Sequence, residues 1–397
     1  MRGLLWLVAV FAAAVALVIF GRASDSYALF VYPPYRVEIS LLFFAVLFAT
    51  ALGLLYFFLR TFGHLLALPT YVRAYRERRR LESAQAAFAS ALLALYEGRY
   101  ARAEKDAAIA FSSGSTRGLA ALIAAQAAHQ LRNFTQRDTW LDRAAGEGEK
   151  MKSAQLVTRA SLALEERDYE SARGALRQLG DNGHRQIASL RMLLRAERGL
   201  GNWEEVLRLA LLLANRDAIA AGVADEHRIQ AHVELLARAA GDREQLERRW
   251  RAIPAVDQVH PRVATEAARH ANLLGAMGFS RQVLEQALEV EWNSPLVSAY
   301  GDLAMVGERE RAQEARHRIE RAEKWLLKRT GDPKLLATLG QLCQYAELWG
   351  KAEACLEASL SFEESRSAHL ALARLLESLG RGSDAQRHFR RAAEVTA

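Results

Sequence analysis

The feature that most constrains this chain is a short turn followed by an aromatic residue, which recurs at a nearly fixed spacing. The four copies read EGRYARA, LRNFTQR, ERDYESA and LGNWEEV. Their aromatic residues, Tyr100, Phe134, Tyr169 and Trp203, follow one another at steps of 34, 35 and 34 along the chain. A period of this length indicates stacked structural units, each too small to bury its own apolar surface.

Each period predicts two helices joined by a tight turn. In EGRYARA, Gly98 tolerates the left-handed backbone of such a turn, Tyr100 begins the second helix, and Ala103 lets the two helices approach closely. A helical hairpin that recurs with this period is typical of tetratricopeptide repeats. We expect repeats to begin near positions 84, 118, 153, 187, 227, 264, 332 and 366.

Two segments depart from this regular pattern. The charged segment 308–328 is off the period and is predicted as a long connecting helix, and Glu347 stands where a turn glycine is usual. Proline is rare, with 7 in 397 residues, and hydrophobic residues make up 51% of the chain, which favours a helical array with a large core. Only YALFVYPPYRVEI (27–39) is predicted as an extended pair or a turn. The predicted fold class is therefore all-α, a tetratricopeptide-like solenoid over 83–397.

The N-terminal part of the sequence predicts a membrane anchor. Two apolar runs carry no charge, one over positions 3–20 and the other over positions 41–59. A helix over the first run is about 27 Å long, close to the thickness of the bilayer core. We expect residues 1–62 to form two transmembrane helices with a short outer loop at 21–40. The alternative is that 3–20 is a cleaved signal peptide with its site at 21–23, and 41–59 would still anchor the chain.

The positive charge of the chain is concentrated beside these apolar runs. Residues 1–80 contain nine arginines against three acidic residues, although the whole chain has a net charge of only +7. The positive-inside rule places the basic arm 63–82, the repeats and both termini in the cytoplasm. The arm either holds anionic lipid or serves only as a topology signal. A nucleic-acid partner is not expected. The arm residues are Arg73, Arg76, Arg78, Arg79 and Arg80.

No motif in the sequence predicts catalysis or a bound cofactor. The stretch closest to a dinucleotide fingerprint, GRGSDA (380–385), follows a helical run and is expected to be the turn of the last repeat. Cys343 and Cys355 are well separated in the sequence and form no CxxC motif, which favours two core residues over a zinc site. The ten histidines are scattered, and His260 and His369 are expected on solvent or groove faces. We therefore expect a protein that is not an enzyme and has no metal.

One set of residues stands out as a candidate binding site. Arg191, Arg195 and Arg198 are spaced by 4 and 3, so they share one face of a helix, and their repeat positions line the concave groove of such arrays. Arg159 in the preceding repeat is a possible fourth member. Guanidinium groups bind carboxylates in a bidentate manner, so this face is a candidate clamp for an acidic ligand. The alternative is a solvated face that is partly neutralised by Glu165, Glu197 or Glu204.

The arrangement of the whole chain resembles the HemY family of bacterial inner-membrane proteins. The resemblance is carried by the two apolar runs, the basic arm, RAEKWL (321–326), LATLGQLC (336–343) and LWGKAEACLEASL (348–360). It implies a repeat scaffold that organises enzymes of late haem synthesis at the cytoplasmic face of the inner membrane. The alternatives are a protein that itself binds porphyrin or haem as a ligand, and a general adaptor for envelope assembly.

Overall fold

The computed structural model describes residues 27–113, 116–181, 186–303 and 307–395. The apolar run 3–20 and positions 21–26 of the expected outer loop lie outside these ranges. The chain divides into two compact units, Met1–Glu147 and Gly148–Ala397, and each is described by itself.

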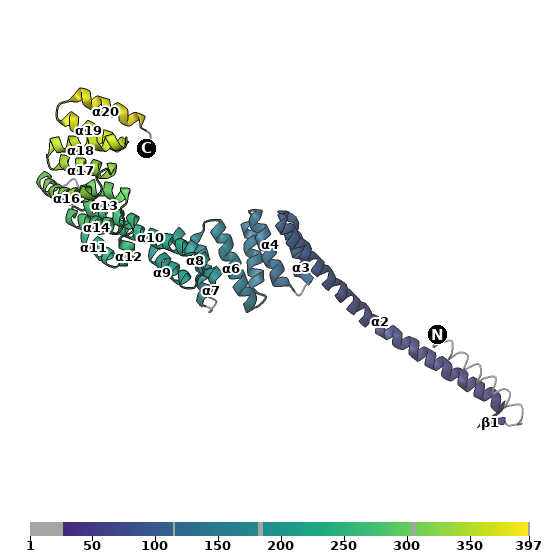
Figure 1. The fold of residues 1–397 in the computed structure, drawn as a ribbon. Coiled ribbons are helices and arrows are strands. Elements are labelled where there is room, and N and C mark those ends of the chain that lie inside the picture. Colours follow the sequence, from purple (N-terminus) through teal and green to yellow (C-terminus); the bar gives the residue numbers. More distant parts are fainter. Residues whose placement is uncertain (1–26, 114–115, 182–185, 304–306, 396–397) are drawn as a thin grey trace. The chain divides into compact units, whose positions relative to one another are not determined.

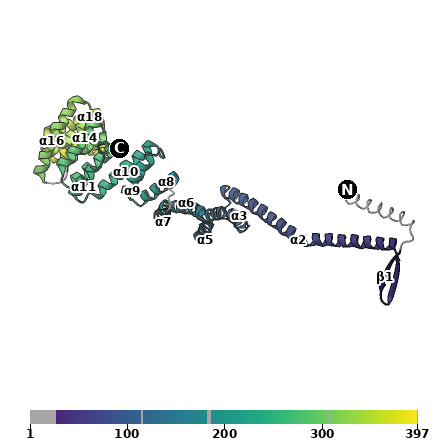
Figure 2. The ribbon, with the colours of Figure 1, turned by 90° about the horizontal axis from the view of Figure 1, so that it is seen from below.

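The first unit begins with a β-hairpin that leads directly into a long helix (Figure 2). β1 (Tyr27–Tyr32) pairs antiparallel with β2 (Tyr35–Ser40) across the cis Pro33–Pro34 bond, which confirms the predicted extended pair. α2 (Leu41–Tyr96) has 56 residues and is thus about 84 Å long. The second apolar run, the basic arm and the first repeat helix therefore belong to one continuous helix. Within the described ranges, no helix presents an apolar stretch of the length that a membrane crossing requires.

The rest of the first unit completes two helical hairpins. α2 packs against α3 (Tyr100–Ser113), and α4 (Arg117–Gln130) packs against both α3 and α5 (Phe134–Ala145). Their core consists largely of alanine, so the helices approach closely. The largest buried side chain there is Trp140, whose ring lies edge-on to Phe111 with centroids 5.6 Å apart.

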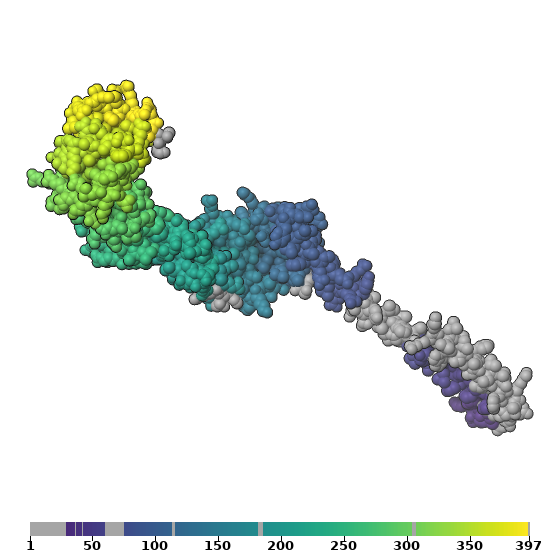
Figure 3. All heavy atoms as spheres, viewed as in Figure 1, coloured from purple at the N-terminus to yellow at the C-terminus, as the bar shows by residue number. Residues whose placement is uncertain are grey.

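The second unit is a succession of helices in which chain neighbours pack side by side (Figure 1). Its last elements, from α13 onward, are closely packed in the space-filling view (Figure 3). The helices are α6 (Glu149–Glu165), α7 (Tyr169–Asp181), α8 (Ile187–Gly199), α9 (Trp203–Ala214), α10 (Ala221–Arg238), α11 (Arg243–Arg251), α12 (Ala255–Gln258), α13 (Pro261–Leu273), α14 (Met277–Val290), α15 (Ser294–Gly301), α16 (Glu308–Lys328), α17 (Pro333–Tyr345), α18 (Trp349–Phe362), α19 (Arg366–Ser378) and α20 (Gly382–Glu394).

Most turns between paired helices share one backbone conformation. Seven of them hold a residue at positive φ, and the second helix begins two residues later. The second helices thus begin at Tyr100, Phe134, Tyr169 and Trp203, which confirms the prediction from the repeat. Arginine or glutamate takes the left-handed conformation where glycine is missing, including Glu347 at φ 60°. The seven residues are Gly98, Arg132, Arg167, Gly201, Gly275, Glu347 and Gly380.

Small residues allow the helices to pack closely, as the repeat predicts. Ala103 and Ala352 are fully buried. A Cβ atom on Gly340 would lie 2.6 Å from Cγ of Leu356, so no larger residue fits between α17 and α18 without movement. The helix predicted for 308–328 is also confirmed, since α16 covers this range.

Candidate functional site

The three groove arginines lie together on the exposed face of α8. Arg191, Arg195 and Arg198 are all exposed. Leu190 and Leu194, which face a different side of the same helix, are buried in a core that α9 and α10 complete. The spacing by four and three places the guanidinium groups on one face because the helix turns once in about 3.6 residues.

The contacts of these arginines leave their charge largely uncompensated. Arg191 Nη2 donates a hydrogen bond to the carbonyl oxygen of Ala218. Burial lowers the pKa of His227 on α10, and the positive charge of Arg198 lowers it further. Among the described residues, none of the three arginines forms an ion pair with a carboxylate. The face therefore carries positive charge that a ligand can meet.

Two of the three carboxylates considered as neutralising this face are engaged by other residues. Glu197 is fully buried, where it accepts hydrogen bonds from Arg177 at 3.0 Å and from Asn202 at 2.6 Å. Glu204 pairs with Arg249 at 2.6 Å. Glu165 is the exposed last residue of α6. The alternative interpretation, a solvated face partly neutralised by nearby carboxylates, does not hold for Glu197, because the side-chain amide of Asn202 and the guanidinium group of Arg177 bind it in the interior.

Arg159 is less exposed than the other three arginines. It belongs to α6, which packs against α8, and it is half-buried. This agrees with its repeat position, which lies closer to the interior of the hairpin. The structure thus brings three of the four expected residues onto one exposed face and leaves the fourth half-buried on a neighbouring helix.

A second polar surface lies on α10 and α13. No feature of the sequence indicates it. Arg262 on α13 donates to Glu226 at 2.7 Å and to Gln230 at 2.6 Å, both on α10. Next to them is a hollow of about 590 Å³ between α10, α13 and the start of α15. Its walls include Thr265 and Asn293, whose side-chain oxygens are buried and have no hydrogen-bond partner among the described residues. The hollow is formed by residues of three elements, α10, α13 and the start of α15, that are far apart in the sequence. No local sequence motif therefore marks it.

The basic arm lies on α2, before the first repeat turn. The side chains of Arg76, Arg78, Arg79 and Arg80 are exposed, and Arg79 lies over the ring of Tyr75 at 5.5 Å. The side chain of Arg73 lies outside the described part of the structure. The exposed guanidinium groups can meet an anionic surface, and nothing in their geometry selects a particular headgroup.

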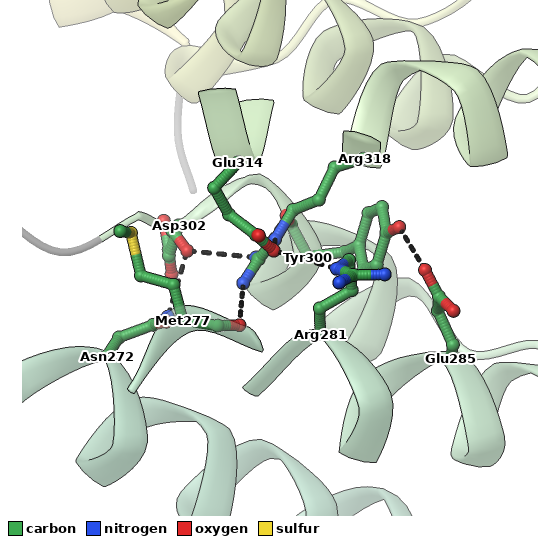
Figure 4. A network of polar contacts seen from close by, with 8 residues as sticks. All are labelled: Asn272, Met277, Arg281, Glu285, Tyr300, Asp302, Glu314 and Arg318. Carbon is green, nitrogen blue, oxygen red and sulfur yellow. Dashed lines mark hydrogen bonds and ion pairs between the residues drawn. The ribbon is translucent and has the colours of Figure 1, made fainter. Parts of the chain in front are cut away.

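A buried polar network in the second unit serves structure rather than binding (Figure 4). Arg318 on α16 is fully buried and pairs with Glu314 at 3.1 Å. Its two terminal nitrogens donate to the carbonyl oxygens of Tyr300, Asp302 and Met277 at 2.8, 3.2 and 3.2 Å. The guanidinium thus ties α14, α15 and α16 together where the repeat period is interrupted.

The cysteines and histidines considered for metal or redox chemistry are partly or fully buried at several positions. Among the described residues, no group of three or more potential ligands could hold a metal ion. Burial raises the pKa of the Cys343 thiol to about 12 and also raises that of Cys355, so both resist ionisation. The expectation that His369 lies on an open face is wrong. It is buried, and its Nδ1 lies 3.0 Å from Nδ1 of His388. Gly380 and Arg381 of GRGSDA form the turn before α20, as expected, and its other four residues begin that helix.

One family model matches part of the chain. Residues 26–132 match the family described as HemY protein N-terminus, which confirms the resemblance to the HemY family. No curated protein matches the chain.

Several solved structures are similar to parts of the chain. A MamA structure shares 18% identity, with a TM-score of 0.25, over 42% of this chain and 88% of that chain. TTC0263, a thermophilic TPR protein of Thermus thermophilus, shares 17% identity, with a TM-score of 0.21, over 61% and 90%. Yeast Tom70 shares 13% identity, with a TM-score of 0.27, over 78% and 69%.

Proposed function

We propose that this protein is a non-catalytic repeat scaffold, anchored in the bacterial inner membrane, that holds enzymes of late haem synthesis together at the cytoplasmic face. The observation that carries the scaffold role is the exposed arginine face of α8 within an array of helical hairpins. Arrays of this kind offer extended surfaces for partner proteins. The link to haem synthesis is supported by the HemY match at 26–132.

The arginine face suits an acidic partner segment. Arg191, Arg195 and Arg198 are exposed, and the carboxylates of Glu197 and Glu204 are held by other residues. A partner carboxylate can therefore form charge-assisted hydrogen bonds without first displacing an internal one. We propose that the ligand is an acidic peptide or the C-terminus of a partner enzyme. The propionate groups of a porphyrin offer the same chemistry and are tested as the alternative.

Membrane anchoring is supported by the first part of α2. Ten of its described apolar side chains are each more than half exposed, which is unfavourable in water. The basic arm that follows supports a cytoplasmic location for the repeats. The exposed side chains are Leu41, Phe43, Leu47, Phe48, Leu52, Leu54, Leu55, Phe57, Phe58 and Leu59. A phosphatase reporter fused after Ala397 should be inactive, and one inserted near Ser26 should be active. The reverse pattern would contradict this topology.

The binding face is tested by changing its charge without changing the fold. We expect Arg191→Gln, Arg195→Gln and Arg198→Gln together to weaken partner binding at least about tenfold, which corresponds to about 1.4 kcal/mol. The control variant replaces three other arginines by glutamine, each of which forms an ion pair with a glutamate of its own helix. This control should bind the partner normally. The three arginines are Arg208, Arg243 and Arg251.

The measurement is affinity purification of each full-length variant from membranes, with quantitative identification of the captured proteins. A porphyrin titration of the same purified proteins runs in parallel. If haem-synthesis enzymes are lost from the triple α8 variant but not from the control variant, the result supports the scaffold function. If the porphyrin affinity falls instead and the captured proteins do not change, the protein binds porphyrin directly. Equal capture by both variants would show that the α8 face does not bind the partner.

A further inference from the structure

A second charged hollow lies away from the α8 arginine face. It is formed by the N-terminal end of α9, the C-terminal end of α10 and the helix α11, and its volume is about 520 Å³. None of the three α8 arginines lines it. The lining residues are Glu204, Leu235, Arg238, Ala239, Gln245, Arg248, Arg249 and Ala252.

The charge of this hollow is unbalanced. The lining residues include three arginines, Arg238, Arg248 and Arg249, and one acidic residue, Glu204. The acidic residue Glu247 on α11 does not reduce the excess, because it pairs with Arg243 at 2.9 Å. The lining therefore carries a net charge of about +2 at neutral pH, since arginine stays protonated and glutamate ionised.

The guanidinium groups are held in place and retain donors for a ligand. Arg238 donates to the carbonyl oxygen of Gly201 at 2.6 Å, and Arg248 Nε donates to the carbonyl oxygen of Glu244 at 3.3 Å. Arg249 Nη2 donates to Glu204 at 2.6 Å. A guanidinium group has five N–H donors, and each of these contacts uses one. The remaining donors can meet an anion that enters the hollow.

Gly201 helps to set this geometry. Its φ of 70° belongs to the turn between α8 and α9, and a Cβ atom there would lie 3.0 Å from Arg238 Nη2. The turn backbone thus approaches the guanidinium closely and fixes it at the rim of the hollow. The side chain of Glu204 is 72% exposed, so it can leave Arg249 at little structural cost.

We propose that this hollow binds the phosphate group of a small ligand, which displaces Glu204 from Arg249. A carboxylate has two oxygens and is matched by a single guanidinium fork. A phosphate monoester has three terminal oxygens and a charge of nearly −2, which fits three guanidinium groups with an excess charge of about +2. The apolar wall of Leu235, Ala239 and Ala252 suits the organic part of such a ligand.

If the ligand displaces Glu204, substitutions of Glu204 and of the arginines should change the ligand affinity in opposite directions. In calorimetric titrations of the full-length protein with glycerol 3-phosphate, Glu204→Gln should tighten binding at least about threefold, because the ligand no longer competes with an internal carboxylate. Arg248→Gln and Arg249→Gln should each weaken binding about tenfold, because each removes a charge-assisted contact. Arg243→Gln, a loss of the same charge on the same helix outside the hollow, should change the affinity less than about twofold.

Three further titrants define the ligand class. Inorganic phosphate should bind more weakly than the ester, and succinate should bind more weakly than both. Short-chain phosphatidic acid compares a lipid headgroup with the soluble ester, and the tighter of these two identifies the source of the phosphate. Weaker binding by Glu204→Gln, an equal loss in Arg243→Gln and Arg249→Gln, or succinate binding as tight as phosphate would each overturn the proposal. The α8 variant should titrate normally, so failure here is independent of the partner-binding test.

Discussion

Replacing Arg318 by methionine should strongly destabilise the second unit. The guanidinium group is fully buried and links Glu314 to carbonyl oxygens of α14 and α15 and of the segment after α15. Removing one member of a buried ion pair costs about 3–5 kcal/mol, because the other charge is left without compensation. Glu314 still forms an ion pair with Arg281 at 3.0 Å, which reduces the loss of stability. The carbonyl oxygen of Tyr300 loses its Arg318 donor, and an unpaired buried polar group costs about 1–3 kcal/mol. We therefore expect a total of about 3–5 kcal/mol.

The companion variant Glu314→Gln separates the ion pair from the carbonyl contacts. It leaves Arg318 its three carbonyl acceptors and its position 5.2 Å from the ring of Tyr300. We expect it to cost less than half of what Arg318→Met costs. Urea unfolding followed by tryptophan fluorescence is a suitable assay, because Trp325 lies 4.9 Å from Tyr300 and reports on this region. Equal losses in the two variants would refute the view that the carbonyl contacts matter more than the pair.

Two further predictions concern packing and pH. Gly340→Ala should destabilise the hairpin α17–α18 by about 1–3 kcal/mol in the same assay, because the new Cβ would lie 2.6 Å from Leu356 Cγ. An unchanged unfolding midpoint would contradict this packing. The pKa of His388 is lowered by its burial and by the positive charges of His369 and Arg387. The folded state therefore disfavours the protonated ring, so stability should be complete above about pH 6.5 and fall as the pH drops below it. His388→Gln should reduce this slope between about pH 7.5 and 5.5, and identical slopes would contradict the assignment.

The local sequence predicted the hairpins because their determinants lie within a few residues of one another. A residue at positive φ, a helix start two residues later and a small residue beyond it are all properties of one turn. Gly98, Tyr100 and Ala103 show this pattern, and the structure has the same arrangement at Glu347, Trp349 and Ala352. The period then follows from the repetition of such turns. The alignment of the α8 arginines was predictable for the same reason, since residues spaced by three and four share a helix face.

The fate of individual charges could not be predicted in this way, because it depends on partners far along the chain. Glu197 and Arg198 are adjacent in the sequence, yet one is fully buried and the other is exposed. Arg318 occurs in a segment so rich in charge that the sequence suggests an exposed helix, and its acceptors belong to Tyr300 and Met277 in other elements. The hollow beside Arg249 likewise needs Glu204, which lies on an earlier helix of the array.

The sequence by itself thus determined the helical repeats, the position of their turns, the two apolar runs and the asymmetry of charge near the N-terminus. These properties depend on backbone conformation and hydrophobicity, which act over a few residues. Only the tertiary structure decided which charged side chains are buried, which are paired and which remain open to a ligand. Helix stacking brings Arg177 to Glu197 and Arg249 to Glu204. The free energy of a charge depends on its surroundings in space, and those surroundings exist only once the helices have packed.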